Sequence, residues 1–276
     1  MPDPVLLIDV RDHVAIVTLN RPDARNALSR ELLTALPEGI AACDADEDVD
    51  VIILTGADPA FCAGIDLESL ASGTVADPPA TPSAPSALST RPSPAAGIRQ
   101  EPFARTGKPL IAAVNGAAVT GGLEVALACD FVVASERARF ADTHAGVGIM
   151  PGWGLTVRLA EAVGHRRARE MSVTGNFVDA RTAYDWGLVN HLVAHEDLLS
   201  YCRALAADIV SNDQPGVREI LATYEAEFAL AHDELLGLES RRSREWMAEG
   251  GGRADEIARR REGIMARGRA QKGDRQ

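Results

Sequence analysis

Two glycine-rich segments constrain the fold of this chain more than any other feature, because each lies between an apolar run and an expected helix. The first, residues 60–67, follows the short apolar run 51–55 and leads into a helix expected to begin at Asp66. The second, residues 114–124, follows the apolar run 110–114 and also leads into a helix. Short runs of this kind are typical of strands buried on both faces of a sheet. Strands that alternate with helices predict an α/β fold.

The regions outside these two segments add a hairpin and further helices. The apolar runs 5–10 and 14–19 are separated by three polar residues and predict a β-hairpin. Ser29 is a suitable N-cap for a helix, in which Pro37 is expected to cause a kink or a division. From about residue 196 the pattern is helical to the end of the chain.

Residues 71–105 interrupt the alternation of strands and helices. This segment contains seven Pro residues with many Ala, Ser and Thr, and it has no apolar periodicity. It is longer than an ordinary connection, so we interpret it as a lid or loop. The expected organisation is an α/β core over residues 1–200, which carries this insert, and a helical C-terminal region over residues 201–276.

The charge of the chain limits the partners that it can bind. The formal net charge of −12 disfavours a nucleic-acid-binding protein, because such proteins are usually basic. Residues 241–276 hold 11 Lys or Arg and 6 Asp or Glu, a net charge of +5, so the rest of the chain carries −17. An anionic ligand must therefore be met by a local basic cluster or by backbone amides.

The sequence carries no sign of membrane insertion or secretion. It has no run of eighteen apolar residues, so we expect no membrane-spanning helix. Its N-terminus does not resemble a signal peptide, which favours a cytoplasmic location. The four cysteines form no C-x-x-C pair and none lies at metal-ligand spacing from a His, so we expect free thiols and no metal site.

The two glycine-rich segments also predict a chemical site. The first backbone N–H groups of a helix have no partner within the helix and lie at the positive end of its dipole. Glycine lets a ligand approach such amides closely. Two of these amides directed at one carbonyl oxygen would form an oxyanion hole, which stabilises negative charge on that oxygen. Either segment alone is common, so the prediction depends on both occurring together.

Several segments together resemble the crotonase (enoyl-CoA hydratase/isomerase) family. Residues 60–67 and 114–124 are similar to its two signature segments, and residues 19–28 to its L-N-R-P-x-x-x-N-A-L opening. Residues 146–154 resemble its glycine-rich segment, and residues 174–190 resemble its T-G…A…A…G-L-V region. The resemblance covers about residues 5–200. It implies a spiral of ββα repeats with a helical C-terminal region, assembled as homotrimers or dimers of trimers.

The resemblance implies an acyl-CoA or enoyl-CoA thioester as the substrate. Coenzyme A is then part of the substrate, and no metal or separate redox cofactor is expected. The implied substrate-binding residues are Ala24, Arg25, Ala63, Asp66, Leu67 and Trp153. Arg25 could meet a phosphate or be an ordinary surface residue, and packing alone would also explain Trp153.

The same resemblance implies an enolate intermediate and a first catalytic carboxylate. The amides of Ile65 and Gly121 would hold the thioester oxygen as it becomes negative. Hydratases of this family use two carboxylates on either side of the double bond, and Glu124 matches the first of them. A Glu in the first turn of a helix can also serve only the helix dipole.

The second catalytic position departs from the family pattern, because His144 stands where a second glutamate is usual. A His can replace a general acid, since its reference pKa is about 6.5 against about 4.3 for Glu. We therefore hypothesise that Glu124 activates water at the β-carbon and that His144 delivers the α-proton. Two alternatives remain at this stage: His144 only lines the pocket, or Asp142 supplies the second carboxylate.

These residues favour enoyl-CoA hydratase activity. An enoyl-CoA isomerase ranks second, because that branch typically keeps the carboxylate that is missing at position 144. Hydrolysis or decarboxylation of another acyl-CoA ranks third. A protein of another class, which binds acyl-CoA without converting it, is a further alternative.

Overall fold

The computed structural model describes residues 3–66 and 101–248, together with residues 263, 265, 266 and 269. Most of the expected lid at 71–105 and the helix expected after Asp66 lie outside the described residues. So does Leu67.

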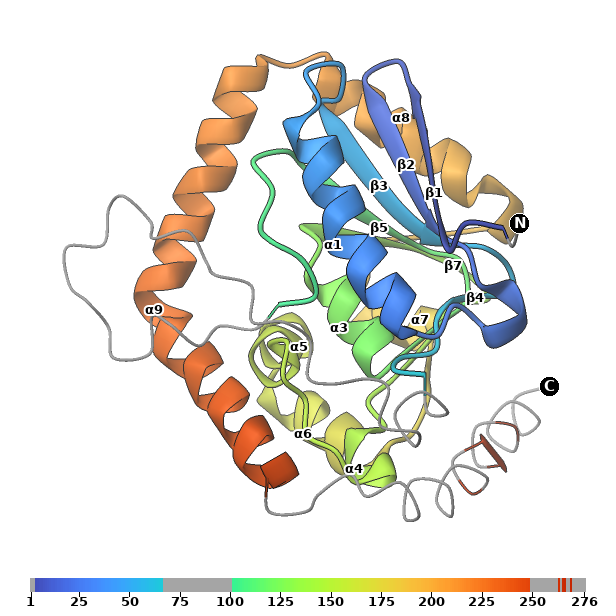
Figure 1. The fold of residues 1–276 in the computed structure, drawn as a ribbon, viewed down its shortest axis with the longest axis vertical. Coiled ribbons are helices and arrows are strands. Elements are labelled where there is room, and N and C mark those ends of the chain that lie inside the picture. The colour runs from blue at the N-terminus through green and yellow to red at the C-terminus, as the bar shows by residue number, and fades with distance from the viewer. Residues whose placement is uncertain (1–2, 67–100, 249–262, 264, 267–268, 270–276) are drawn as a thin grey trace.

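Six strands form the larger of two sheets, in the order β1-β2-β3-β5-β7-β10 (Figure 1). The predicted hairpin is confirmed, because β1 (Leu6–Arg11) and β2 (Val14–Leu19) pair in antiparallel fashion. The remaining strands continue parallel to β2; they are β3 (Val51–Gly56), β5 (Leu110–Val114), β7 (Phe131–Ser135) and β10 (His191–Val193).

Strand β3 is apolar at successive positions because it faces a hydrophobic core on each side. Its residues Ile52 and Leu54 belong to the core that includes side chains of α1 (Arg30–Ala45). Val51 and Ile53 belong to a second core, which includes side chains of α8 (Leu198–Val210). Burial on both faces is the arrangement expected for a central parallel strand.

Helix α1 begins as the sequence predicts but is not divided. The Ser29 hydroxyl accepts a hydrogen bond from the backbone N–H of Leu32, 3.3 Å away, and so caps the helix. The helix continues through Pro37, so of the two expected effects, a kink or a division, the division does not occur. Leu32, Leu36 and Ile40 are buried in the same core on either side of Pro37, and this shared packing holds both halves of the helix in place.

Four short strands form the smaller sheet, in the order β4-β6-β8-β9. They are β4 (Ala60–Cys62), β6 (Ala117–Val119), β8 (Arg139–Ala141) and β9 (Val178–Asp179). The first three are parallel, and β9 runs antiparallel to β8. In chain order β4, β6 and β8 follow β3, β5 and β7, so the chain passes repeatedly from the larger sheet to the smaller one. The glycine-rich segments therefore leave neighbouring strands at the same edge.

Helices surround the two sheets and complete the fold. The short helices are η1 (Pro22–Ala24), α3 (Gly121–Leu127), α4 (His144–Val147), α5 (Leu155–Val163), α6 (His165–Thr174), α7 (Ala180–Trp186) and η2 (His195–Asp197). The long helix α9 (Gln214–Ala248) runs along one side of the molecule and packs against α5 (Figure 1). The helical character predicted from about residue 196 is confirmed within the described residues.

No helix in the described part of the chain is both long enough and apolar enough to span a bilayer.

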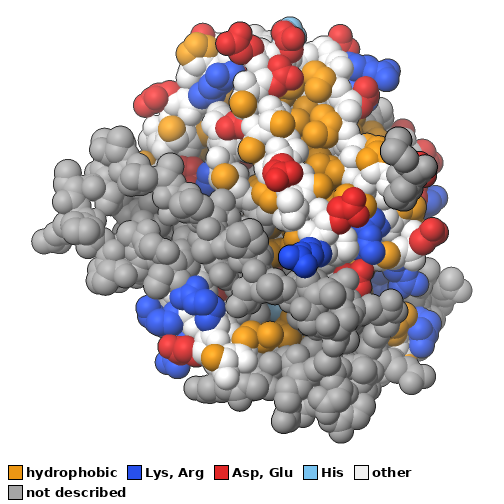
Figure 2. Space-filling model, viewed as in Figure 1, with side chains coloured by type: hydrophobic (Ala, Val, Ile, Leu, Met, Phe, Trp, Pro, Cys, Tyr) orange, Lys and Arg blue, Asp and Glu red, His pale blue; other side chains and the backbone are white. Residues whose placement is uncertain are grey.

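The surface that faces the viewer in Figure 1 is mixed in character. Figure 2 shows hydrophobic side chains gathered over β1 and α1, with charged side chains around them. Leu7, Ile8 and Val10 of β1 are the exposed large hydrophobic residues of this edge strand. This apolar surface lies on the edge strand of the larger sheet.

Candidate active site

The structure brings the two glycine-rich segments together through the pairing of β4 with β6. Gly64 has a φ of +88°, and a Cβ at this position would lie 2.7 Å from the carbonyl oxygen of Val119 and 3.4 Å from the amide nitrogen of Gly121. A Cβ on Gly121 would lie 3.7 Å from Cγ1 of Ile65. The two residues expected to form the oxyanion hole are therefore neighbours, and glycine is needed for their close approach.

The backbone geometry leaves the N–H groups of both residues available. Ile65 forms an isolated parallel bridge with Leu28. In this bridge the Leu28 N–H donates to the carbonyl of Gly64, and the Leu28 carbonyl accepts from the N–H of Asp66. The N–H of Ile65 is therefore not used by this bridge. Gly121 is the first residue of α3, where an N–H has no partner within the helix. Neither N–H donates to an acceptor within the described ranges 3–66 and 101–248.

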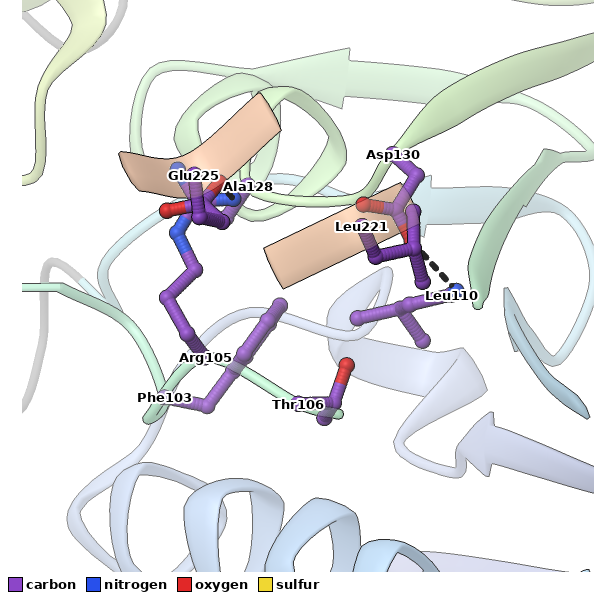
Figure 3. Close-up of a pocket in the computed structure, with 8 residues that line it drawn as sticks. All are labelled: Phe103, Arg105, Thr106, Leu110, Ala128, Asp130, Leu221 and Glu225. Atoms are coloured by element: carbon purple, nitrogen blue, oxygen red, sulfur yellow. Dashed lines mark hydrogen bonds and ion pairs between the residues drawn. The ribbon is translucent and has the colours of Figure 1, made fainter. Parts of the chain in front are cut away.

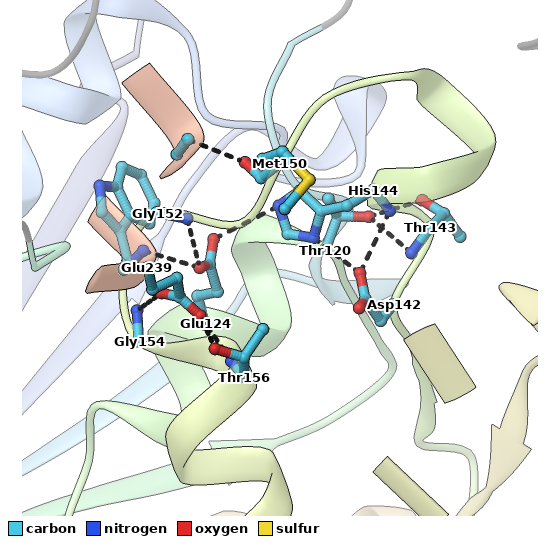
Figure 4. A network of polar contacts seen from close by, with 12 residues as sticks. Thr120, Glu124, Asp142, Thr143, His144, Met150, Gly152, Gly154, Thr156 and Glu239 are labelled. Atoms are coloured by element: carbon cyan, nitrogen blue, oxygen red, sulfur yellow. Dashed lines mark hydrogen bonds and ion pairs between the residues drawn. The ribbon is translucent and has the colours of Figure 1, made fainter. Parts of the chain in front are cut away.

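Glu124 lies in the first turn of α3 and is almost fully buried, with 3% of its surface exposed. Its Oε1 accepts hydrogen bonds from the backbone N–H groups of Trp153 at 2.8 Å and Gly152 at 3.2 Å. Its Oε2 lies 3.6 Å from Nε2 of His144 (Figure 4). One carboxylate oxygen is thus fixed by the backbone, and the other is directed at the imidazole.

The position of Glu124 depends on close packing of α3. A Cβ on Gly122 would lie 2.1 Å from the carbonyl oxygen of Cys62 in β4, so only glycine fits between the helix and this strand. Burial raises the pKa of Glu124 to about 7, and the charges of Glu239 and Asp142 add to this effect. The charge of His144 acts in the opposite direction. A carboxyl group with such a pKa can exchange protons near neutral pH.

His144 is buried at the start of α4 and is held by Asp142. The Asp142 carboxylate accepts hydrogen bonds from Nδ1 of His144 at 2.6 Å and from its backbone N–H at 3.1 Å. Because Nδ1 donates to a carboxylate, Nε2 is the ring nitrogen free to exchange a proton with Glu124 or a substrate. Burial opposes protonation of His144, but the Asp142 hydrogen bond and the charge of Glu124 outweigh it, so the pKa of His144 is raised.

The Asp142 carboxylate contacts the imidazole and the backbone N–H of His144, so it is already engaged in holding this residue. Burial works against its ionisation, but the hydrogen bonds and charge of His144 lower its pKa, so it stays ionised. Sequence reasoning placed Asp142 only as an alternative to His144 and missed this pairing. An Asp two residues before the first helical residue is a local signal for it, because such an Asp readily accepts the N–H two positions on.

The structure brings together part of the expected coenzyme A region. The N–H of Ala63 donates to the carbonyl of Arg25 at 3.0 Å, so these two residues are adjacent, and Ala24 precedes them in η1. Arg25 has an exposed side chain and a left-handed backbone with φ of 52°. The Asp66 carboxylate lies 3.0 Å from Nη2 of Arg21 in an ion pair. A role for Asp66 in binding substrate would therefore also involve Arg21.

Trp153 and Asn26 support the site from two sides. The Trp153 ring is buried, and a Cβ on Gly121 would lie 3.6 Å from it, so the ring lies against the oxyanion segment. Asn26 is fully buried, and its Nδ2 donates to the carbonyls of Ala57 at 2.8 Å and Ala60 at 2.7 Å. Sequence reasoning used Asn26 only as a motif letter. Its role is to fasten the segment around Arg25 to the start of β4.

A small cavity elsewhere in the molecule does not belong to this site. It has a volume of about 10 Å³ and lies between residues 103–106, the start of β5 and helix α9 (Figure 3). Asp130 on its wall accepts a hydrogen bond from the N–H of Leu110 at 2.7 Å. None of its lining residues belongs to the cluster around Glu124.

A family model described as "Enoyl-CoA hydratase/isomerase" matches residues 9–251, which include every element of the cluster. The chain belongs to the enoyl-CoA hydratase/isomerase family. A member from Arabidopsis thaliana named "Probable enoyl-CoA hydratase 1, peroxisomal" is 38% identical over 233 residues, or 83% of this chain and 82% of that protein. A "Crotonyl-CoA hydratase" from Syntrophomonas wolfei is 35% identical over 215 residues, or 77% of this chain and 78% of that protein.

Solved structures of the enoyl-CoA hydratase/isomerase family share the fold. An enoyl-CoA hydratase from Mycobacterium smegmatis is 45% identical with a TM-score of 0.78, and the match covers 90% of this chain and 100% of that one. An enoyl-CoA hydratase from Mycobacterium tuberculosis H37Rv is 43% identical with a TM-score of 0.77, covering 89% and 99%. The α/β crotonase fold predicted from the sequence is confirmed.

Proposed function

We propose that this family member is an enoyl-CoA hydratase, which adds water across the α,β double bond of an enoyl-CoA thioester. The observation that carries the proposal is the buried pair of Glu124 and His144, 3.6 Å apart. This pair lies in the same helix–strand cluster as the two available amides of Ile65 and Gly121. Relatives and structural neighbours named as enoyl-CoA or crotonyl-CoA hydratases support the proposal.

The two amides would stabilise the charge that the reaction creates. When water attacks the β-carbon, electrons move through the conjugated system to the thioester oxygen and form an enolate. The N–H groups of Ile65 and Gly121 would donate to this oxygen and bind it more strongly as it becomes negative. Loss of one such donor typically costs about 10²–10³ in kcat.

During the addition the base, Glu124, would gain a proton and the acid, His144, would lose one. Ionised Glu124 takes a proton from the attacking water, and the protonated imidazole of His144 gives its Nε2 proton to the α-carbon. After the addition Glu124 carries one extra proton and His144 lacks one. A transfer from Oε2 of Glu124 to Nε2 of His144, across the 3.6 Å gap directly or through a water, restores both groups. No proton is gained or lost by the site over a cycle.

The remaining predicted residues would bind the coenzyme A and acyl parts of the substrate. The coenzyme A end of the substrate would lie along Ala24, Arg25 and Ala63, where the exposed Arg25 guanidinium can meet a phosphate. Trp153 would form a wall of the acyl pocket beside Gly121. Asp66, fixed by Arg21, and Leu67 would line the same side. Coenzyme A arrives as part of the substrate, and the reaction as proposed needs no separate cofactor.

The test is turnover of crotonyl-CoA and of a longer enoyl-CoA, followed by the loss of absorbance of the conjugated thioester. We expect the wild type to hydrate at least one of them, and Glu124→Gln and His144→Ala to lose about 10²–10⁴ in kcat. His165→Ala is a matched control, because His165 is exposed at the start of α6. If His144→Ala keeps most of the activity, His144 only lines the pocket.

A wild type that binds both thioesters and hydrates neither would contradict the proposal. Migration of a double bond in a β,γ-enoyl-CoA would then identify an isomerase. Release of free coenzyme A would identify a hydrolase, and binding without any conversion would identify a non-catalytic acyl-CoA-binding protein.

We also propose a homotrimer or a dimer of trimers, with residues 1–200 as the core and 201–276 as the helical oligomerisation region. Sedimentation that finds a fully active monomer would contradict this assembly. A cytoplasmic location stays a prediction, since one relative is named as peroxisomal and another as mitochondrial.

A further inference from the structure

A third buried carboxylate, Glu239 of helix α9, lies next to the catalytic cluster. Only 6% of its surface is exposed. Its Oε1 accepts a hydrogen bond from the N–H of Gly154 at 2.6 Å, and its Oε2 accepts one from the N–H of Thr156 at 2.7 Å and another from the Thr156 hydroxyl. Glu239 therefore caps the start of α5 from a different helix, where a negative charge is favoured by the helix dipole.

Two further residues of α9 hold the same segment. The Ser240 hydroxyl donates to the carbonyl of Gly152 at 3.2 Å, and the Ser243 hydroxyl donates to the carbonyl of Met150 at 3.3 Å. Residues 150–156 are thus attached to α9 at both ends. Figure 4 shows Glu239 and Glu124 beside this segment, each accepting hydrogen bonds from it.

The other side of the segment holds the catalytic carboxylate. The N–H groups of Gly152 and Trp153 donate to Oε1 of Glu124, and the next residue, Gly154, donates to Glu239. A shift of the segment away from α9 would move both donors of Glu124 at once.

We infer that Glu239 is a positioning residue for Glu124: it fixes residues 152–156 so that one carboxylate oxygen of Glu124 is held by the backbone and the other faces His144. This inference rests on the proposed hydratase function and adds a residue from the C-terminal helix to its machinery. Glu239 itself touches neither the substrate nor the reacting atoms.

The negative charge of Glu239 also acts on the pKa values of Glu124 and His144. The charged groups that act on Glu124 are His144 and Asp142 from the β8–α4 region and Glu239 from α9. After burial and the opposing charge of His144, the negative charge of Glu239 is the next factor, and it raises the pKa of Glu124. It also raises the pKa of His144. Removal of this charge should lower both pKa values, whereas a purely mechanical role would leave them unchanged.

The first experiment compares Glu239→Gln with the wild type in the enoyl-CoA hydration assay over a range of pH. The substitution removes the charge and replaces one hydrogen-bond acceptor with a donor. We expect kcat to fall about tenfold with KM changed less than about twofold, because only the catalytic geometry is affected. Both limbs of the pH profile should shift toward lower pH.

Two other variants serve as controls. Glu245→Gln makes the same chemical change at an exposed position of α9, where Glu245 pairs with Arg242, and should leave kcat and the pH profile unchanged. Thr156→Val removes one hydrogen bond of Glu239 but keeps its charge. It should reduce kcat by a smaller factor, about threefold, and should not shift the pH profile.

Amide hydrogen exchange of residues 150–156 provides a readout that needs no turnover. Exchange of the Gly152 and Trp153 amides should be at least about tenfold faster in Glu239→Gln than in the wild type and in Glu245→Gln. Unchanged exchange together with an unchanged pH profile would overturn the inference while leaving the hydratase function intact. If the wild type hydrates no enoyl-CoA, the proposed function fails, and the exchange rates alone decide whether Glu239 positions the segment.

Discussion

Replacement of Asp142 with Asn tests whether this buried carboxylate sets the orientation and proton of His144. Asp142 accepts two hydrogen bonds from His144, at 2.6 Å from Nδ1 and at 3.1 Å from the backbone, and is 1% exposed. A buried hydrogen bond to a charged group contributes about 1.5–3 kcal/mol. If that energy is lost from the transition state, kcat should fall about 10- to 150-fold, at about 1.4 kcal/mol for each factor of ten. KM should change little.

The pH profile of enoyl-CoA hydration separates this effect from general damage. Burial opposes protonation of His144, and without the Asp142 charge its pKa should fall, so the alkaline limb of kcat should move to lower pH. Asp185→Asn is a matched control, because Asp185 is exposed at the end of α7. An Asp142→Asn enzyme that keeps more than half of the wild-type kcat and the same alkaline limb would refute the proposed role.

Three further predictions concern packing, ionisation and stability. Gly122→Ala should abolish measurable turnover, since its Cβ would lie 2.1 Å from the Cys62 carbonyl oxygen; activity within about threefold of wild type in the same assay would contradict this. Glu124→Gln should be more stable than wild type at about pH 8 by about 1–3 kcal/mol, because Glu124 ionises near pH 7 when buried and near 4.5 when unfolded. The wild type loses stability relative to the variant as pH rises through this window, so melting curves at about pH 4 should show no such gain. Asn26→Ala should lower the free energy of unfolding by about 2–4 kcal/mol in urea titrations, because the carbonyls of Ala57 and Ala60 lose their buried donor; a loss below about 0.5 kcal/mol would contradict it.

The sequence predicts the features of this protein that depend on neighbouring residues. The short apolar run 51–55 identifies β3 as a strand buried on both faces, and the spacing from Gly121 to Glu124 places the carboxylate in the first turn of α3. The departure at His144 is also visible, because it occurs at a fixed distance from a motif. Each of these predictions needs only one element and its periodicity.

Features that depend on packing between distant elements could not be predicted in this way. The approach of His144 to Glu124 depends on how α4 and α3 are placed, and the contact of Glu239 with Thr156 depends on how α9 packs against α5. Pro37 shows the same limit, since its effect on α1 depends on the core that holds both halves of the helix.

The donors proposed for the oxyanion hole are main-chain N–H groups, so their positions depend on the backbone and not on the side chain of the residue that carries them. The N–H of Ile65 is oriented by the backbone bridge to Leu28, not by its side chain, which packs near Val147 and Ile149. A substitution at this position can therefore change the packing against Val147 and Ile149 while the N–H donor of the proposed oxyanion hole is kept.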